Sequence, residues 1–484
     1  MKLHKLFIGL GLSCAAVLSS CEKIIEVEPE YVKDGSQIYT SLKDYEFALT
    51  GSYALFRATA YYGTGAQTTG SWSILPDMMG TNLVQTAEDL ANWQNQVNWV
   101  YTADESDVTE AWIAAYSVIA QANLTLRNID RFAVDGDVKA VNRIKGQALA
   151  IRAMVHFDLL RFWGEEYDRN STKLGIPYKT VVDIEDKPAR LSVKESYDKI
   201  LADMEQAETL LAEVDKEVNA GTARANIDKA AVQALLARIH LYAKNYAQAE
   251  SYATLAIDAR PLAARTDFPN IWKDATTAEV IWAVPYNAGE GSPATGIHIS
   301  SSNRNRFRPS SALEATYDQT NDIRFASYFG SRVLSGASRR IVTKYYGRGT
   351  AADNLVNWKA LRTGEMYLIR AEARALQGVV QALAGLADLN ALRAARINNY
   401  VPVVLTGQAL LDAIALERQK ELFGEGHQWF DVKRTTKTIN RTDVVLTTTI
   451  KTLAPAAREW TWPIPTGELD SNPTIKPQQT PGYN

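Results

Sequence analysis

The most informative stretch of this chain is Ile414-Ala-Leu-Glu-Arg-Gln-Lys-Glu-Leu-Phe-Gly-Glu-Gly-His-Gln-Trp-Phe-Asp-Val-Lys-Arg434. Glu417 and Glu421 are four residues apart, so a helix would place them on one face. Glycoside hydrolysis requires two carboxylates about 5–9.5 Å apart, and this stretch is acidic enough to be considered for that role. The interleaved cations favour a charge-laced helix end instead. The charges concerned are Glu417, Glu421, Glu425 and Asp431, near Arg418, Lys420, Lys433 and Arg434.

Helical patterns extend on the amino-terminal side of this stretch. Alanine-rich helix pairs are predicted near residues 230–261 and 362–396, and small residues at these positions are typical of tetratricopeptide repeats, whose paired helices approach closely. Further helices are predicted at Val138–Trp163 and Val193–Leu211 from their apolar periodicity. We therefore expect a mainly α fold: a tetratricopeptide-like helical superhelix scaffold with a loop-rich face and a few short strands.

Two segments interrupt the helical pattern and are predicted to be loop excursions. They span residues 61–101 and 285–360, and a strand is expected just before the second, at Val280–Val284. Loops of this length inside a globular chain are usually functional or disordered, and the first is too aromatic for disorder. The proline-rich tail from Ala454 is expected to be mostly extended and irregular.

The amino terminus has the pattern of an exported lipoprotein. Lys2 and Lys5 precede an apolar run that is too short to span a bilayer, and Leu18-Ser-Ser-Cys21 matches a lipobox. We predict a signal peptide at residues 1–20, lipid attachment at Cys21, an acidic tether at 21–40 and a single domain at 41–484. Cleavage before Cys21 leaves no second cysteine, so no disulfide can form within the mature chain.

Motifs for common chemistries are missing from the sequence. It contains no phosphate-binding glycine loop, no GxSxG elbow and no HExxH helix, and no two of its five histidines have metal-ligand spacing. The formal net charge of −3 gives no electrostatic footprint for nucleic acid. We expect no catalytic residue, no metal, no cofactor and no nucleic-acid partner.

Four segments, taken in order, resemble the SusD/RagB family of nutrient-binding lipoproteins. They are Gly146–Leu160, Leu361–Ala373, the quoted Ile414–Arg434, and the closing Trp462-Pro-Ile-Pro-Thr-Gly-Glu468 with Asn472-Pro473 and Gln479-Thr-Pro-Gly-Tyr483. Two positions depart from the family pattern: Gln428 replaces the usual arginine and Thr480 the usual asparagine. Gln428 puts an ion pair at that point in doubt.

The resemblance implies a role in nutrient uptake. Family members are lipid-anchored in the outer membrane, face the cell exterior, and pair with a SusC-like TonB-dependent transporter barrel. They capture oligosaccharides, or in some cases peptides, and are not enzymes. The quoted motifs are signatures of the fold, so the resemblance implies that Arg418 and Glu421 form buried or semi-buried pairs that hold the scaffold. Two other classes stay open: a helical surface glycoside hydrolase, and a repeat scaffold for protein assembly.

A sugar site requires aromatic platforms edged by polar side chains, because sugar rings have apolar faces and hydroxyl rims. Two loop segments, 61–99 and 286–308, fit this description. Trp99, Trp112 and Trp282 lie in apolar, periodic surroundings and are expected in the core, whereas Trp72 and Trp93 have polar neighbours. On that basis we predict that Trp93→Ala abolishes glycan binding with little change in stability. The predicted ligand-binding residues are Trp72, Asp77, Asn82, Asn92, Trp93, Asn95, Tyr286, Arg304 and Arg306.

Overall fold

The computed structural model describes residues 39–64, 71–133, 137–214, 218–219, 223–299, 304–334, 336–349 and 355–483. The predicted signal peptide, Cys21 and all but the last two residues of the predicted tether lie outside these ranges. Contacts between residues separate residues 1–47 from a compact unit formed by 48–484, so each is described by itself. In the first, Asp44 in the opening turn of α3 (Leu42–Leu55) accepts hydrogen bonds from the backbone N–H groups of Thr40 and Ser41 and so stabilises the start of that helix.

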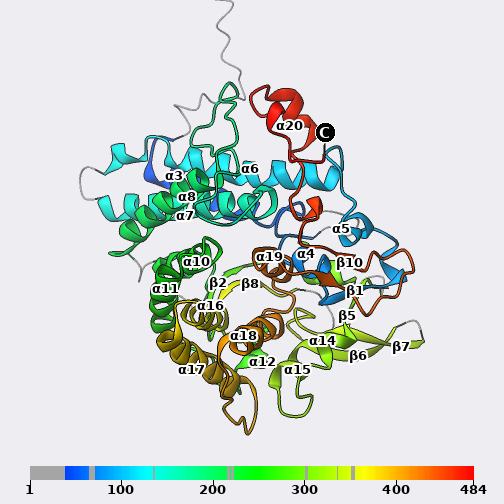
Figure 1. Ribbon diagram of the computed structural model, residues 1–484. Coiled ribbons are helices and arrows are strands. Elements are labelled where there is room, and N and C mark those ends of the chain that lie inside the picture. Colours follow the sequence, from blue (N-terminus) through cyan, green and yellow to red (C-terminus); the bar gives the residue numbers. More distant parts are fainter. Residues whose placement is uncertain are drawn as a thin grey trace, which may run out of the picture. The chain divides into compact units, whose positions relative to one another are not determined.

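Long helices form most of the second unit and follow one another as packed pairs (Figure 1). Helix α7 packs against α6 and α8, α10 against α11, α11 against α16, and α16 against α17 and α18. The mainly α, repeat-like fold class is therefore confirmed. The long helices are α3 (Leu42–Leu55), α6 (Ser106–Leu126), α7 (Val138–Trp163), α8 (Val193–Leu211), α10 (Lys229–Tyr242), α11 (Tyr246–Ala259), α16 (Thr363–Ala375), α17 (Val379–Arg396) and α18 (Gly407–Glu421).

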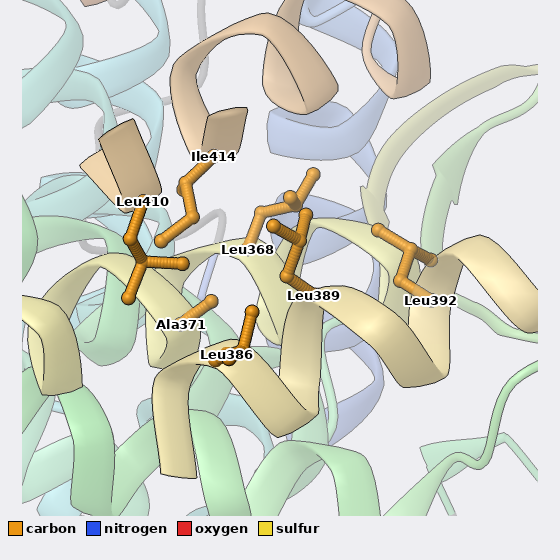
Figure 2. Packing of buried hydrophobic residues seen from close by; sticks show 7 residues of the cluster. All are labelled: Leu368, Ala371, Leu386, Leu389, Leu392, Leu410 and Ile414. Atoms are coloured by element: carbon orange, nitrogen blue, oxygen red, sulfur yellow. The ribbon is translucent and has the colours of Figure 1, made fainter. Parts of the chain in front are cut away.

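Small residues allow these helices to approach closely. A Cβ atom placed on Gly385 of α17 would lie 2.6 Å from the carbonyl oxygen of Ala371 on α16. Leucines of α16, α17 and α18 pack together near Ala371, as Figure 2 shows. The buried cluster comprises Leu368, Ala371, Leu386, Leu389, Leu392, Leu410 and Ile414.

Short elements connect and cover the helices. They are α4 (Leu75–Met78), α5 (Gln94–Asn98), α12 (Phe268–Ile271), α13 (Ala294–Ile297), α14 (Ser311–Glu314), α15 (Ile323–Tyr328), α19 (Gln428–Arg434), α20 (Thr466–Ser471) and the 3-10 turns η1 (Ala87–Asp89), η2 (Ile129–Phe132), η4 (Arg458–Trp460) and η5 (Lys476–Gln478). Among the described residues, no helix combines the length and apolar character needed to cross a bilayer.

The strands pair into two-stranded antiparallel ribbons. The expected strand at Val280–Val284 is β2; it pairs with β8 (Trp358–Arg362), and both strands are fully buried. The other pairs are β1 (Leu83–Gln85) with β5 (Phe307–Pro309), β3 (His298–Ile299) with β4 (Arg304–Asn305), β6 (Phe329–Leu334) with β7 (Ala337–Val342), and β9 (Ile439–Asn440) with β10 (Thr452–Leu453).

The carboxyl-terminal end of α18 belongs to a buried network of ion pairs. Glu421 is fully buried, and its carboxylate lies 2.9 Å from Arg362 and 3.0 Å from both Arg396 and Arg324. Arg362 also contacts Glu279 and Glu425, each at 2.6 Å. Each charge therefore has partners from distant parts of the chain, as a buried ion requires.

The quoted acidic stretch is structural, as expected. Burial would raise the pKa of Glu417, but the cations of Arg324, Lys420 and Arg393 hold it at about 2. Arg418 is buried too, although its partner is Asp431 at 3.1 Å rather than a glutamate of its own helix. The lowered pKa values of Glu417, Glu421 and Asp431 keep these three carboxylates ionised and paired, an arrangement that stabilises the scaffold and does not suit proton transfer.

Candidate ligand-binding face

The two loop segments predicted to bind ligand meet in the structure. Strand β1 of the first pairs with β5 of the second, with Leu83 opposite Pro309 and Gln85 opposite Phe307. The hydroxyl of Tyr286 donates to the carbonyl oxygen of Tyr62 at 2.8 Å. Segments more than 200 residues apart in sequence therefore form one face. We call this surface, built from segments 61–99 and 286–308, the loop face.

Asp77 and Asn82 anchor the base of the first segment. The buried carboxylate of Asp77 accepts from the Asn82 side-chain amide at 2.6 Å and from the backbone N–H groups of Gly424 and Gly426 at 3.1 and 2.8 Å. Burial raises the pKa of Asp77 to about 6, although these donors oppose the shift. Both residues connect the loop to the helical scaffold, and their polar groups are used within the protein.

Gln428 completes this anchor. Its side-chain oxygen accepts from the backbone N–H groups of Thr81 and Asn82 at 2.7 and 2.9 Å, and its amide nitrogen donates to the Thr81 hydroxyl at 2.5 Å. The neutral amide makes hydrogen bonds to the loop backbone where an arginine would bring a charge.

A second buried cluster surrounds Asp89. Its carboxylate accepts from the backbone N–H of Trp93 at 3.1 Å and lies 3.5 Å from the guanidinium group of Arg306. Both Trp93 and Arg306 are fully buried, and the side chain of Asn92 donates to the carbonyl oxygen of Asp89 at 2.5 Å. The hydrogen bonds and the ion pair of Asp89 therefore fix the conformation of this part of the loop.

All eleven tryptophans are buried, with exposed fractions between 0 and 6%. Trp72 packs against Tyr61, Phe162 and Trp163, with ring centroids 5.0, 4.6 and 5.8 Å away. In this structure neither Trp72 nor Trp93 offers a ring face to solvent, so their contact with a ligand stays a prediction. Burial of Trp99, Trp112 and Trp282 agrees with the expectation that they belong to the core.

The accessible edge of the loop face centres on Glu88. Its carboxylate accepts from the backbone N–H of Asn305 at 2.7 Å and from Arg339 at 2.9 Å, and its carbonyl oxygen accepts from Arg304 at 2.8 Å. Burial opposes ionisation, but these donors hold the pKa of Glu88 below its ordinary value. Of the predicted residues, Arg304 reaches this edge, whereas Asn95 lies apart from it, bound to Glu105 at 2.7 Å.

The β6–β7 hairpin supplies residues that the sequence analysis missed. Arg332 donates to the hydroxyl of Tyr346 and lies 5.7 Å from the centre of its ring, and both side chains are half-buried. The ring of His298 lies 5.4 Å from that of Tyr346. Burial and the Arg332 cation lower the pKa of His298 to about 4, so it is neutral at pH 7. The sequence Ser335-Gly336 between two strand-like runs was the available signal, because a Ser-Gly dipeptide marks a turn.

The chemistry of this edge suits an oxygen-rich ligand. Arg304, Arg332 and Arg339 supply guanidinium donors, Glu88 is the acceptor among them, and the ring of Tyr346 is a half-exposed apolar surface. No group of three or more histidine, cysteine, aspartate or glutamate side chains suited to a metal occurs in the described ranges.

The structure places this chain in the class of repeat-like helical scaffolds that hold one loop-built face, and comparison with known proteins identifies the family within that class. Residues 52–241 match the family model described as "Starch-binding associating with outer membrane", and residues 312–483 match that of the SusD family. The chain belongs to the SusD/RagB family.

Individual relatives cover almost the whole chain. SusD-like protein P38 from Formosa agariphila is 24% identical over 90% of this chain and 91% of its own. A SusD superfamily protein from Bacteroides thetaiotaomicron is 25% identical with a TM-score of 0.81, over 91% of this chain and all of its own. A putative sugar binding protein from Bacteroides vulgatus is 25% identical with a TM-score of 0.75, over 92% and 99%.

Proposed function

We propose that this protein is a nutrient-binding lipoprotein of the cell surface. It captures oligosaccharides on the loop face and delivers them to a SusC-like TonB-dependent transporter in the outer membrane. Support comes from family membership, from the lipobox at Cys21, and from the model that matches residues 52–241, which is described as starch-binding. The protein acts by binding and release and breaks no bond.

The observation that carries this proposal is the joining of the two loop segments. Arg304, Arg339 and Glu88 come from three different segments, and both arginines donate to Glu88, Arg304 to its carbonyl oxygen at 2.8 Å and Arg339 to its carboxylate at 2.9 Å. Fixed donors and acceptors beside an apolar ring select hydroxylated ligands at a low entropic cost, because the groups are already ordered. We place the ligand against Tyr346 and Arg332, within reach of this edge.

Calorimetric titration tests ligand capture. Maltoheptaose, cellohexaose, fructan oligosaccharides and oligogalacturonate serve as probes, with Tyr346→Ala and Arg332→Ala as the test variants. Each variant should weaken binding at least tenfold, corresponding to about 1.4 kcal/mol, without changing the fold. Arg265→Ala is the matched control, because this half-buried arginine lies outside the loop face and bonds Asn398 and Ala394 at the end of α17. Unchanged affinity in both test variants would show that the ligand does not bind at this face.

Cell experiments test anchoring and delivery. Acyl labelling should be lost in Cys21→Ala, and protease treatment of intact cells should degrade the wild-type protein. Mild detergent extraction should co-purify a barrel transporter. A protein that resists protease on intact cells would contradict the outward orientation.

A further inference from the structure

A second cleft lies outside the loop face. It has a volume of about 530 Å³ and is bounded by α6, by the segment 177–188 and by α20. This volume is typical of small-molecule sites. Its lining shares no residue with the loop-face edge around Glu88 and Tyr346.

Two aromatic side chains lie at the floor of this cleft, the partly exposed ring of Tyr116 and the buried ring of Trp112, which is only 4% exposed. Trp112 and Tyr116 are one helical turn apart on α6, with ring centroids 4.8 Å apart. The Tyr116 hydroxyl donates to the carbonyl oxygen of Pro177 at 2.8 Å, and the Trp112 ring rests against Trp163 at 5.1 Å. Both rings are therefore fixed before any ligand arrives.

The facing wall is also held in shape. The Lys179 ammonium lies 3.1 Å from the Asp186 carboxylate and donates to the carbonyl oxygen of Asp183 at 3.4 Å, which closes the segment on itself. Asn123 donates to the Lys179 carbonyl oxygen and Asn472 to the Pro188 carbonyl oxygen, each at 3.1 Å. The hydrogen bonds of this segment fix its shape without burying its aliphatic side chains.

Those aliphatic side chains remain exposed at the mouth of the cleft. The exposed fractions are 57% for Ile113, 49% for Val181, 46% for Val182 and 87% for Ile184. Apolar side chains gathered at one place on a surface mark a contact site more often than a single exposed residue does. Here they border an aromatic floor, so one ligand could contact both.

Polar groups complete the edge. Glu468 of α20 accepts from the Trp112 indole N–H at 3.4 Å, and Asp183 uses one carboxylate oxygen for the backbone N–H of Glu185 at 2.9 Å. Lys187 makes no hydrogen bond or ion pair with any residue that the structure describes. Acceptors and a cationic donor thus remain available around the aromatic floor.

We propose that this cleft is a second sugar-binding site, in which a pyranose ring lies against the partly exposed ring of Tyr116, backed by the buried Trp112, and its hydroxyls bond Asp183, Lys187 and Glu468. The inference rests on the proposed function for its ligand class and adds a site outside the loop face. A purely apolar peptide fits less well, because it would bury these charged groups without partners. Two sites on one chain would strengthen the capture of long glycans.

Filling the cleft from an exposed position tests the proposal. Ser117 lines the cleft, is exposed, and bonds only the Ile113 carbonyl oxygen of its own helix, so Ser117→Arg occupies the space without disturbing the core. Ser251→Arg on α11 is the matched control, an exposed serine outside the cleft. Each substitution is introduced into the wild type and into Tyr346→Ala, and binding of the four named oligosaccharides is measured by calorimetry.

The expected result is residual binding by Tyr346→Ala that Ser117→Arg abolishes and Ser251→Arg leaves intact. In the wild type, Ser117→Arg should weaken binding of the longest chains by about tenfold or more. Unchanged binding in both Ser117→Arg proteins would overturn the second site and leave the proposed function standing. No binding of any of the four probes by the wild type would count against the proposed function, and the second site would fall with it. A gain of apolar-peptide binding in place of glycan binding, sensitive to Ser117→Arg, would overturn the sugar assignment.

Discussion

Around Glu421 the charged groups are fully buried, and each is matched by partners from distant segments, whereas at Glu88 arginines outnumber carboxylates along a half-exposed edge. In the first region each buried charge is paired with a buried charge of opposite sign, and these ion pairs hold the helices together. The second keeps donors near solvent, where an incoming ligand can use them. Charge density alone does not separate a scaffold from a binding face; burial and the origin of the partners do.

Removing one cation from the buried region should have the largest effect. Arg362→Met leaves Glu279, Glu421 and Glu425 short of a partner, so we expect a loss of about 5 kcal/mol in the free energy of unfolding, measured in urea. The control is Arg374→Met, which breaks partly exposed pairs and should cost about 1 kcal/mol or less. Equal losses in the two variants would abolish the distinction between the regions.

Substitution of Trp93 tests whether a buried side chain of the loop face serves packing or ligand contact. Because its ring is fully buried, Trp93→Ala should lower the free energy of unfolding by about 4 kcal/mol. Tyr346→Ala, at the half-exposed edge, should leave stability nearly unchanged and weaken glycan binding. Thermal melting and calorimetry on both variants separate packing from contact. Lost binding with intact stability in Trp93→Ala would restore the role predicted for it from sequence.

Acid should weaken the scaffold through His156. Burial and the Arg152 cation lower its pKa to about 3, and its ring nitrogen Nε2 accepts the Lys179 N–H at 3.1 Å. An unfolded histidine gains a proton near pH 6.5 while the folded one stays neutral, so stability falls as the pH drops from about 6.5 towards 3. Its contribution should be about 2 kcal/mol between pH 7 and 5.

Urea unfolding at both pH values measures this acid effect. His156→Gln, which cannot titrate, should show a correspondingly smaller loss on acidification. A variant as acid-sensitive as the wild type would place the titrating group elsewhere, for example at His240, whose pKa burial lowers to about 4.

The helical part of the fold could be predicted because its signals are local. Apolar periodicity defined Val138–Trp163 and Val193–Leu211, and these are the bounds of α7 and α8. The candidate site could be predicted only in outline. Trp93 has polar neighbours in sequence, yet it is buried by a loop whose shape depends on Asp89 and on Arg306 from the other loop segment. Pairings across more than 200 residues leave no local pattern.

Arg332 and Tyr346 were missed for a related reason. Both lie outside the segments 61–99 and 286–308 that were predicted to bind sugar, and their proximity depends on the β6–β7 register, which pairs Arg332 with Arg339. The hairpin turn was visible in the sequence, but the face on which its side chains would lie was not. A one-residue shift in register would move Arg332 to the opposite side.

Gln428 connects the first loop segment to α19 of the scaffold, and its substitution should show the smallest effect of the series. Gln428→Ala leaves the backbone N–H groups of Thr81 and Asn82 without their acceptor, so we expect a loss of about 1–2 kcal/mol in the free energy of unfolding. Gln428→Glu keeps the acceptor oxygen and is the control for that loss. Hydrogen exchange at the two amides should rise in Gln428→Ala while the amides of α16 stay protected. Faster exchange throughout α16 would instead mean that the loop anchor and the helical scaffold unfold as one unit.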